Sequence, residues 1–138
     1  MAAAEKEYKD LERRGTFKTV KKTQATKTLP VMWVYTYKFD INGYFTKYKA
    51  RLCIRGDLQP LNHQDTYAAT LAARTFRALM AITAAFDLEA RQFDAVNAFT
   101  NSQMDETVYI EFPDKYKMPG YCILLLRALY GLRRSPLL

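Results

Sequence analysis

Cysteine and histidine are nearly absent from this sequence, which holds two cysteines and one histidine in 138 residues. Cys53 and Cys122 lie far apart, form no CxxC pair and are remote from His63. This scarcity excludes a disulfide framework and the common cysteine–histidine zinc sites. We expect both thiols to be reduced residues of the core. His63 lies in GDLQPLNHQDTYAAT, whose composition predicts a loop, and we assign it no role.

Long apolar runs are also missing. No apolar stretch approaches the roughly 18 residues that a membrane span requires. The N-terminal segment MAAAEKEYKDLERRGTF mixes acids with bases and lacks the apolar core of a secretory signal. We therefore expect a soluble, intracellular protein, in the cytoplasm or nucleus. The sequence also lacks repeats, and its length and its 49% of hydrophobic residues fit one domain with a sizeable core.

Charge is present but divided along the chain. Residues 1–60 carry 13 bases and 6 acids, residues 61–114 carry 3 bases and 8 acids, and residues 115–138 carry 5 bases and no acid. The net charges of these segments are therefore +7, −5 and +5. Basic segments attract phosphate backbones and acidic ones attract divalent metals, so a nucleic-acid protein with a metal site is one interpretation. An unevenly charged but merely solvated surface is the other.

Local patterns predict an α+β fold in which an antiparallel sheet packs on helices. Residues 2–14 predict a charged helix ended by Gly15, and the Lys/Thr-rich residues 18–28 predict a linker. Apolar residues at helical spacing predict a helix over residues 71–86 that belongs to the core scaffold. Further strands are predicted in VYIEF, in YCILLL and in ARQFDAVNAF. The last of these is expected to run into a turn or helix.

The clearest local signal is Asn42-Gly43 between WVYTYKFDI and YFTKYKARLCIR, which predicts a hairpin with a two-residue type I′ turn. Placing Ile41 opposite Tyr44 sorts the side chains onto two faces. One face is aromatic and apolar and is expected to pack on the core; it holds Trp33, Tyr35, Tyr37, Phe39, Ile41, Tyr44, Thr46, Tyr48, Ala50 and Leu52. The other is mostly cationic; it holds Val34, Thr36, Lys38, Asp40, Phe45, Lys47, Lys49 and Arg51, with Arg55 beyond the pairing. This second face is either simply solvated or a phosphate-binding surface.

The segment RQFDAVNAFT places Asp94 inside an apolar run. A buried, unpaired carboxylate is costly, so Asp94 must be neutral, paired or exposed at a strand end. Three interpretations stay open from the local sequence: a helix N-cap, an ion pair with a residue such as Arg91, or a metal ligand. The other acids of the second half are interpreted as surface groups; they are Asp87, Glu89, Asp105, Glu106, Glu111 and Asp114.

Four segments in order resemble the reverse transcriptase domain of Ty1/copia-type retrotransposons. They are WVYTYKFDINGYFTKYKARLCIRG, TYAATLAARTFRALMAI, RQFDAVNAFTNSQMDETVYIEFP and LLLRALYGLRRSP, and together they cover nearly the whole chain. The resemblance implies a fingers-like part over approximately residues 1–75, with the hairpin at residues 33–55. It also implies an incomplete palm over approximately residues 76–138.

The resemblance also implies roles for single residues. Asp94 would be the first catalytic aspartate of the palm and a ligand for Mg²⁺, with the Ala95 carbonyl in the same metal region. Asn97 and Ala98 would offer backbone N–H groups to the triphosphate. Further implied roles concern the nucleotide and template: Lys49 and Arg51 for the phosphates, Phe99 under the sugar, and Gly131 for close approach, with Tyr130, Ser135 and Pro136 beside it.

The family's second set of metal ligands, a Tyr/Phe-x-Asp-Asp hairpin, has no match in these 138 residues. Two-metal nucleotidyl transfer requires more than one carboxylate. The first hypothesis is therefore a fragment of an RNA-directed DNA polymerase that is inactive alone, with RNA or DNA primer–template and dNTP as partners. The second is a host-retained nucleic-acid-binding module without catalysis. A third is a poorly folded remnant with exposed strand edges.

Overall fold

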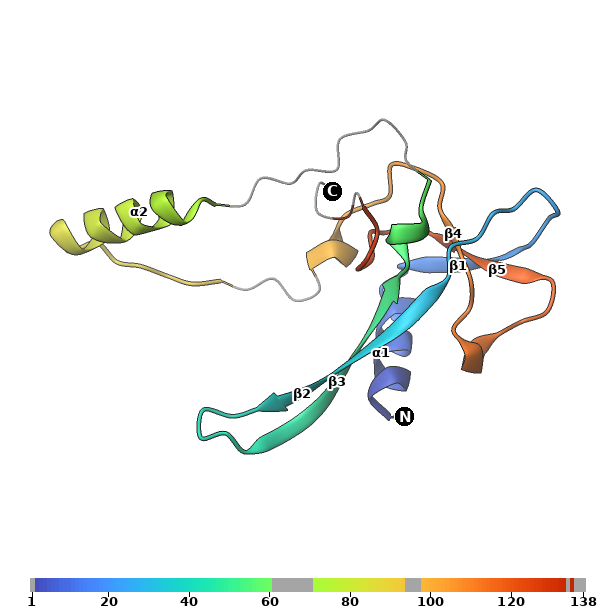
Figure 1. Ribbon diagram of the computed structural model, residues 1–138, viewed down its shortest axis with the longest axis horizontal. Coiled ribbons are helices and arrows are strands. Elements are labelled where there is room, and N and C mark those ends of the chain that lie inside the picture. The colour runs from blue at the N-terminus through green and yellow to red at the C-terminus, as the bar shows by residue number, and fades with distance from the viewer. Residues whose placement is uncertain (1, 61–70, 94–97, 134, 136–138) are drawn as a thin grey trace.

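The structure, a computed structural model, describes residues 2–60, 71–93, 98–133 and 135 (Figure 1). Within these residues the fold is mixed α/β, with antiparallel sheets and two α-helices, in agreement with the predicted class. One sheet has three strands in the order β1-β5-β4, and the other is the hairpin of β2 and β3. Neither helix in the described ranges is long and apolar enough to cross a bilayer.

The three-stranded sheet joins the two ends of the described chain. β1 (Phe17–Lys21) pairs antiparallel with β5 (Tyr121–Leu125), so that Phe17 faces Leu125. The two-residue strand β4 (Tyr109–Ile110) pairs with the other edge of β5. β4 and β5 confirm the strands predicted in VYIEF and YCILLL. The predicted linker is wrong in its first part, because residues 18–21 form a strand whose pairing partner lies far along the sequence.

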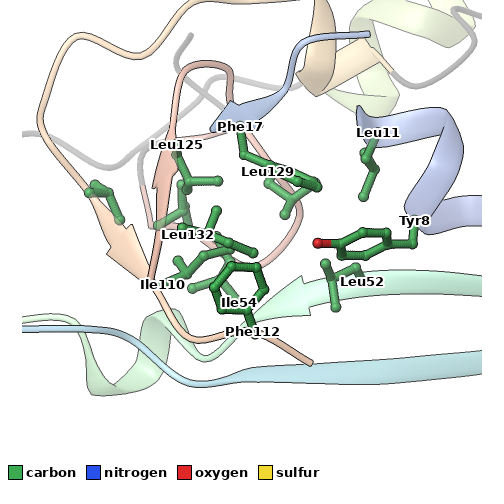
Figure 2. Packing of buried hydrophobic residues seen from close by; sticks show 12 residues of the cluster. Tyr8, Leu11, Phe17, Leu52, Ile54, Ile110, Phe112, Leu125, Leu129 and Leu132 are labelled. Atoms are coloured by element: carbon green, nitrogen blue, oxygen red, sulfur yellow. The ribbon is translucent and has the colours of Figure 1, made fainter. Parts of the chain in front are cut away.

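The first helix, α1 (Ala2–Arg13), confirms the predicted N-terminal helix. Gly15 ends it with φ 63°, and the Thr16 N–H donates to the Leu11 carbonyl at 3.0 Å, a bonding pattern typical of glycine-terminated helices. Tyr8 and Leu11 point from α1 into the core, where they meet the end of β3, β5 and residues 129–132 (Figure 2). The buried cluster consists of Tyr8, Leu11, Phe17, Leu52, Ile54, Val108, Ile110, Phe112, Ile123, Leu125, Leu129 and Leu132.

The hairpin consists of β2 (Val31–Phe39) and β3 (Phe45–Ile54). Its pairing follows the predicted register from Val31 opposite Ile54 to Lys38 opposite Lys47, and then shifts so that Phe39 faces Phe45. The predicted type I′ turn is wrong: Gly43 has φ 84°, but Asn42 does not have positive φ.

A longer turn replaces the predicted type I′ turn. The Asp40 N–H donates to the Tyr44 carbonyl at 2.9 Å and the Gly43 N–H to the Asp40 carbonyl at 3.1 Å, as in a type I turn followed by a glycine bulge. The Asp40 carboxylate also accepts bonds from the N–H groups of Asn42 and Tyr44. This local bonding by the aspartate favours the longer turn. The bulge moves Phe45 from the predicted cationic face to the aromatic face.

The expectation that the whole aromatic face packs on the core is also wrong. Only the base of β3 is buried, through Ala50, Leu52 and Ile54. Farther out, the side chains of Tyr37 and Tyr48 are 63% and 62% exposed. The hairpin projects beyond the three-stranded sheet, as Figure 1 shows. Alternation therefore predicted which residues share a face, but not how much of that face is covered.

The second helix, α2 (Ala73–Ala85), confirms a helix within residues 71–86 but not its predicted place in the core. None of its residues is buried by the described part of the chain, and Phe76 is 54% exposed. Figure 1 shows α2 apart from both sheets. Helical periodicity indicates an apolar stripe, whereas burial also depends on a partner that local sequence does not specify.

Residues predicted to form the strand 90–99 lack strand structure where they are described. Residues 90–93 are irregular, and a 3₁₀-helix, η2 (Ala98–Asn101), follows the undescribed residues 94–97. The helical turn matches the expected end of the segment. The described part of the chain holds two further 3₁₀-helices: η1 (Gly56–Leu58) after β3, and η3 (Asp114–Tyr116) before β5.

Both cysteines are free, as expected. Cys122 is buried in β5, whereas Cys53 is only half-buried, which corrects its predicted place in the core. Burial raises the pKa of the Cys53 thiol, and the nearby Arg51 guanidinium opposes that rise. Cys53 is therefore held in its neutral form.

Candidate functional site

The end of β3 contacts the segment after β5 backbone to backbone. The Ile54 N–H donates to the Tyr130 carbonyl at 2.8 Å. Gly131 has φ 92°, and a Cβ added there would overlap the carbonyl oxygen of Ile54. A Cβ added to Gly56 would in turn overlap the carbonyl oxygen of Gly131. Both positions therefore require glycine, and their contact fixes residues 130–132 against the hairpin.

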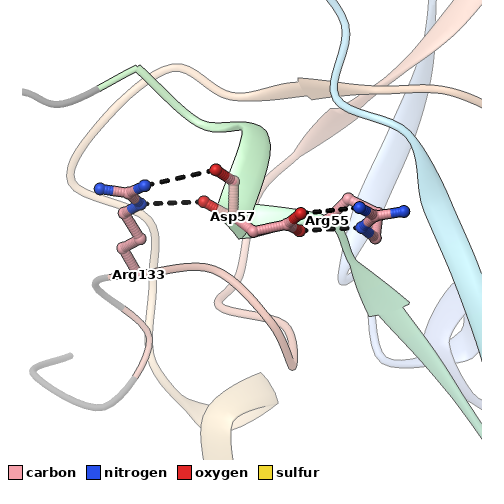
Figure 3. Close-up of polar contacts among 4 residues, drawn as sticks. Arg55, Asp57 and Arg133 are labelled. Carbon is pink, nitrogen blue, oxygen red and sulfur yellow. Dashed lines mark hydrogen bonds and ion pairs between the residues drawn. The ribbon is translucent and has the colours of Figure 1, made fainter.

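Arginine side chains reinforce this junction (Figure 3). Arg133 Nε donates to the Gly56 carbonyl at 2.9 Å, and its Nη2 donates to the Asp57 carbonyl at 3.3 Å. Arg55 forms two hydrogen bonds with the Asp57 carboxylate, at 2.8 and 2.7 Å. This pairing lowers the pKa of Asp57 and keeps it ionised. Arg55 and Asp57 are exposed, so their ion pair contributes less to stability than the arginine–backbone bonds on the half-buried side.

Three side chains from separate segments meet beside this junction. The Arg51 guanidinium lies 5.4 Å from the centre of the Tyr130 ring, a cation–π contact. Phe99 of η2 meets the same ring edge to face, with 4.9 Å between ring centres. All three side chains are half-buried. The Arg51 Nε is buried and has no hydrogen-bond partner among the described residues. The trio thus combines a partly free guanidinium with two aromatic rings.

A carboxylate on α1 lies near the cations of this hairpin. Burial raises the pKa of Glu7, whereas Lys49 and Arg51 act in the opposite direction. Both cations are half-buried on β3, and their effect on Glu7 shows that α1 contributes to the electrostatics of the hairpin. Ionised Glu7 offsets part of the positive charge that Lys49 and Arg51 present.

Comparisons with known proteins identify the family of the chain. Residues 14–138 match the family model described as reverse transcriptase (RNA-dependent DNA polymerase). The chain belongs to this reverse transcriptase family. It is 28% identical to the retrovirus-related Pol polyprotein from transposon TNT 1-94 of Nicotiana tabacum over 141 residues, which covers 99% of this chain and 11% of that protein.

Two further relatives are similar over shorter stretches. The Pol polyprotein from transposon RE2 of Arabidopsis thaliana is 29% identical over 75% of this chain and 8% of that protein. The transposon Ty1-BL Gag-Pol polyprotein of Saccharomyces cerevisiae is 31% identical over 64% of this chain and 5% of that protein. The resemblance to Ty1/copia-type elements is thereby confirmed, and the chain spans about a tenth or less of these relatives. No solved structure matches the chain.

Of the residues that the reverse transcriptase resemblance singles out, Arg51, Phe99 and Tyr130 meet directly, and Gly131 adjoins them. Lys49 lies two residues from Arg51 on β3, and Ala98 is exposed at the start of η2. Asp94, Ala95 and Asn97 lie outside the described residues, as do His63 and Pro136. Ser135 is buried, and its hydroxyl donates to the Leu129 carbonyl at 2.6 Å, so it has a structural role.

The acids of this reverse transcriptase domain form no metal site within residues 2–60, 71–93, 98–133 and 135. Arg91 pairs with Glu89 at 2.9 Å. The six acids interpreted as surface groups are exposed, except for Glu106, which is half-buried and accepts a hydrogen bond from Gln59 at 3.1 Å. The described residues therefore provide no test of magnesium binding, since the predicted ligand, Asp94, lies outside them.

Sequence reasoning missed Gly56, Glu7 and Arg133 as parts of this site. Gly56 directly follows a strand, a position where glycine often marks a close backbone approach, so a signal was present. Glu7 and Arg133 act through contacts with distant segments, and their local sequences carry no comparable signal.

Proposed function

We propose that this chain provides the nucleotide-binding fingers and the first part of the palm of a retrotransposon RNA-directed DNA polymerase. The fingers-like part would comprise approximately residues 1–75, with the hairpin 33–55, and the palm part approximately residues 76–138. The meeting of Arg51, Phe99 and Tyr130 carries this proposal. Family resemblance assigns all three to the nucleotide, and they come from segments far apart in the sequence.

The proposed contacts follow from side-chain chemistry. The half-buried Arg51 guanidinium offers its N–H donors to a triphosphate, and Lys49 adds a second cation on the same strand. Phe99 would lie under the sugar and exclude a 2′-hydroxyl. Tyr130 would hold both the guanidinium and the Phe99 ring in place. The dNTP and a primer–template are thus the proposed ligands.

Asp94 is the proposed magnesium ligand, by family resemblance alone. Magnesium prefers oxygen ligands, and a single carboxylate does not complete the two-ion arrangement of nucleotidyl transfer. Since no Tyr/Phe-x-Asp-Asp sequence occurs in the 138 residues, we propose that the chain does not transfer nucleotides by itself. The missing ligands would have to come from other residues of a longer polymerase.

Primer extension tests this inactivity. The purified chain, incubated with a poly(A) template, an oligo(dT) primer, dTTP and magnesium, is expected to extend no primer. The same reaction with an intact retroviral reverse transcriptase is the positive control. Extension by the chain that is lost in Asp94→Ala would refute the proposal of inactivity.

Nucleotide binding tests the site itself. We expect Arg51→Ala to weaken dTTP binding about tenfold, because hydrogen bonds to charged groups contribute roughly 1.5–3 kcal/mol. Tyr130→Ala should weaken it less, and Tyr130→Phe should restore most of the affinity because the ring is retained. Isothermal titration calorimetry measures both effects. Equal dTTP affinity in the native chain and Arg51→Ala would contradict the assignment.

A second candidate function is intracellular nucleic-acid binding without catalysis. Lys38 and Lys47 face each other on the exposed part of the hairpin, and this pairing of like charges favours an anionic ligand. This function predicts salt-sensitive binding of RNA or primer–template that weakens when Lys47, Lys49 and Arg51 are replaced. Affinity that is independent of salt and of these replacements would exclude it.

A further inference from the structure

One edge of the three-stranded sheet is open. β1 lies at the end of the strand order β1-β5-β4, and in the part of the chain that the structure describes it pairs with β5 alone. The opposite edge, that of β4, is covered by Leu29, which forms a bridge with Ile110. An edge strand presents unpaired backbone N–H and C=O groups, to which a further strand can bind.

The hydrogen bonds at the two ends of β1 determine which backbone groups point outward. The Lys22 N–H, directly after β1, donates to the Gly120 carbonyl at 2.8 Å. At the other end, the Thr16 carbonyl accepts hydrogen bonds from the segment after β5. Bonding alternates along an antiparallel pair, so the even-numbered residues of β1 direct their N–H and C=O groups to β5. Those of Thr19 and Lys21 point to the open edge.

The charge along this edge is of one sign. Residues 13–30 hold six bases and no acid. Lys18, Lys21 and Lys22 are exposed, and none of them forms an ion pair with another described residue. Lysines on an edge strand disfavour pairing with a second edge of the same charge. They favour a partner of the opposite charge, which is an acidic strand.

We propose that the open edge of β1 binds an extended acidic peptide as an additional strand. Backbone bonds to Thr19 and Lys21 would supply affinity, and the lysines would select acidic side chains. Lys18 and Lys22 lie on the same face with Val20 between them, because side chains alternate along a strand. The peptide that fits this face therefore carries two acids four residues apart, with an apolar residue midway.

A nucleic acid fits this edge less well than a peptide. Its phosphates would attract the lysines, but it has no row of alternating N–H and C=O groups to pair with those of Thr19 and Lys21. None of the residues assigned to the nucleotide takes part, so peptide binding at β1 is independent of the proposed function.

Fluorescence anisotropy with a labelled peptide of about ten residues, built around Glu-Thr-Val-Thr-Glu, tests the charges of the edge. Lys18→Ala and Lys22→Ala should each weaken binding about twofold to fivefold, from the loss of one exposed cross-strand charge pair. Lys9→Ala, which removes an exposed lysine on α1, is the matched control and should leave affinity unchanged. Unchanged affinity in both edge variants would overturn the proposal.

Thr19→Pro tests the backbone bonds. Proline has no N–H, so the variant removes one outward donor and keeps the pairing with β5, to which residue 19 donates nothing. Peptide affinity should fall about tenfold or more, because an unmade backbone bond is added to the bulk of the ring. Circular dichroism should confirm that the variant is folded.

Alternate N-methylation of the peptide makes the same test with the native chain. One of the two alternating patterns should abolish binding and the other should leave it nearly intact, since only every second peptide N–H faces β1. Equal affinities for the two patterns would contradict strand addition.

Hydrogen exchange followed by NMR locates the bound strand. At saturating peptide, the amides of Thr19 and Lys21 should exchange about tenfold or more slowly, whereas those of Lys18 and Val20, which face β5, should change little. Absence of protection at Thr19 and Lys21 would overturn the proposal. Binding of an oligouridine strand but not of the peptide would also overturn it, as would self-association that is lost in Thr19→Pro without any peptide binding.

Discussion

The base and the outer part of β3 carry the same alternation of apolar residues but have opposite surroundings. At the base, Leu52 and Ile54 are 0% and 3% exposed and pack against α1, β5 and residues 129–132. In the outer part, Phe45 and Tyr48 lie on the same apolar face and are largely exposed. Alternation therefore determines the side on which a residue lies, whereas burial depends on what the rest of the chain places there.

Composition separates the two parts as clearly as burial does. The base carries aliphatic side chains, whereas the outer part carries aromatic rings beside Lys38 and Lys47. Aliphatic side chains are suited to close-packed interiors, and exposed rings are suited to stacking. The difference indicates that the base contributes stability, whereas the outer part presents its rings and lysines to solvent.

The largest expected effect is on the free energy of unfolding when a side chain in each part is truncated to alanine. Leu52→Ala should lower the free energy of unfolding by about 2–5 kcal/mol, because the side chain is fully buried. Tyr37→Ala, in the outer part, should cost about 1 kcal/mol or less, because little burial is lost. Urea unfolding followed by circular dichroism measures both values. Equal losses would show that the outer aromatic cluster is also a core.

An intermediate effect is expected at the junction that holds the base of the hairpin. Gly131→Ala should cost about 2–4 kcal/mol, since it combines unfavourable φ with overlap of the Ile54 carbonyl. Gly43→Ala is the matched control, because its φ is 84° and a Cβ there meets nothing within 4 Å. It should cost only about 1 kcal/mol. The same urea titration compares them, and a Gly131→Ala cost no larger than that of Gly43→Ala would contradict the close contact.

The smallest effect concerns the charge of α1 beside the hairpin. Burial raises the pKa of Glu7 above its ordinary value of 4.5, so the folded state favours the protonated carboxyl. The resulting contribution to the free energy of unfolding is present in full below pH 4.5. It is lost as pH rises through the folded-state pKa. Glu7→Gln should therefore be more stable than the native chain at pH 7, by less than about 1 kcal/mol because the site is partly solvated, with the difference shrinking below pH 4.5.

Glu12→Gln, an exposed change on the same helix, should show no comparable pH-dependent gain. A stability difference that stays constant between pH 4 and 7 would show that Glu7 does not change protonation on folding.

Much of the fold could be predicted from local sequence. The hairpin register, the N-terminal helix with its glycine end, the helix within residues 71–86 and the strand β5 follow from short patterns. The prediction of the turn type was wrong because the Asp40 carboxylate binds nearby N–H groups and so favours a longer turn. β1 was missed because its Lys/Thr-rich sequence lacks an apolar run, and its strand structure depends on pairing with β5.

The site was predictable only as separate residues. Arg51, Phe99 and Tyr130 were each singled out from resemblance, but their contact depends on the junction between Gly56 and Gly131. No local pattern predicts a backbone contact between residues so far apart. Glu7 was missed for the same reason, because Lys49 and Arg51 act on the pKa of Glu7 only when α1 lies beside β3.

The pairing of β1 with β5 also constrains the order of folding. The hairpin has only local contacts to form and can close in microseconds, as soon as its residues have left the ribosome. Among the described residues, β1 pairs only with β5, so this pairing cannot form until residues 121–125 have been synthesised, and closing so long a loop is slow. During synthesis, the apolar sides of α1 and β1 therefore stay exposed until the rest of the core has been made. Chaperone binding is expected to concentrate on them in that interval.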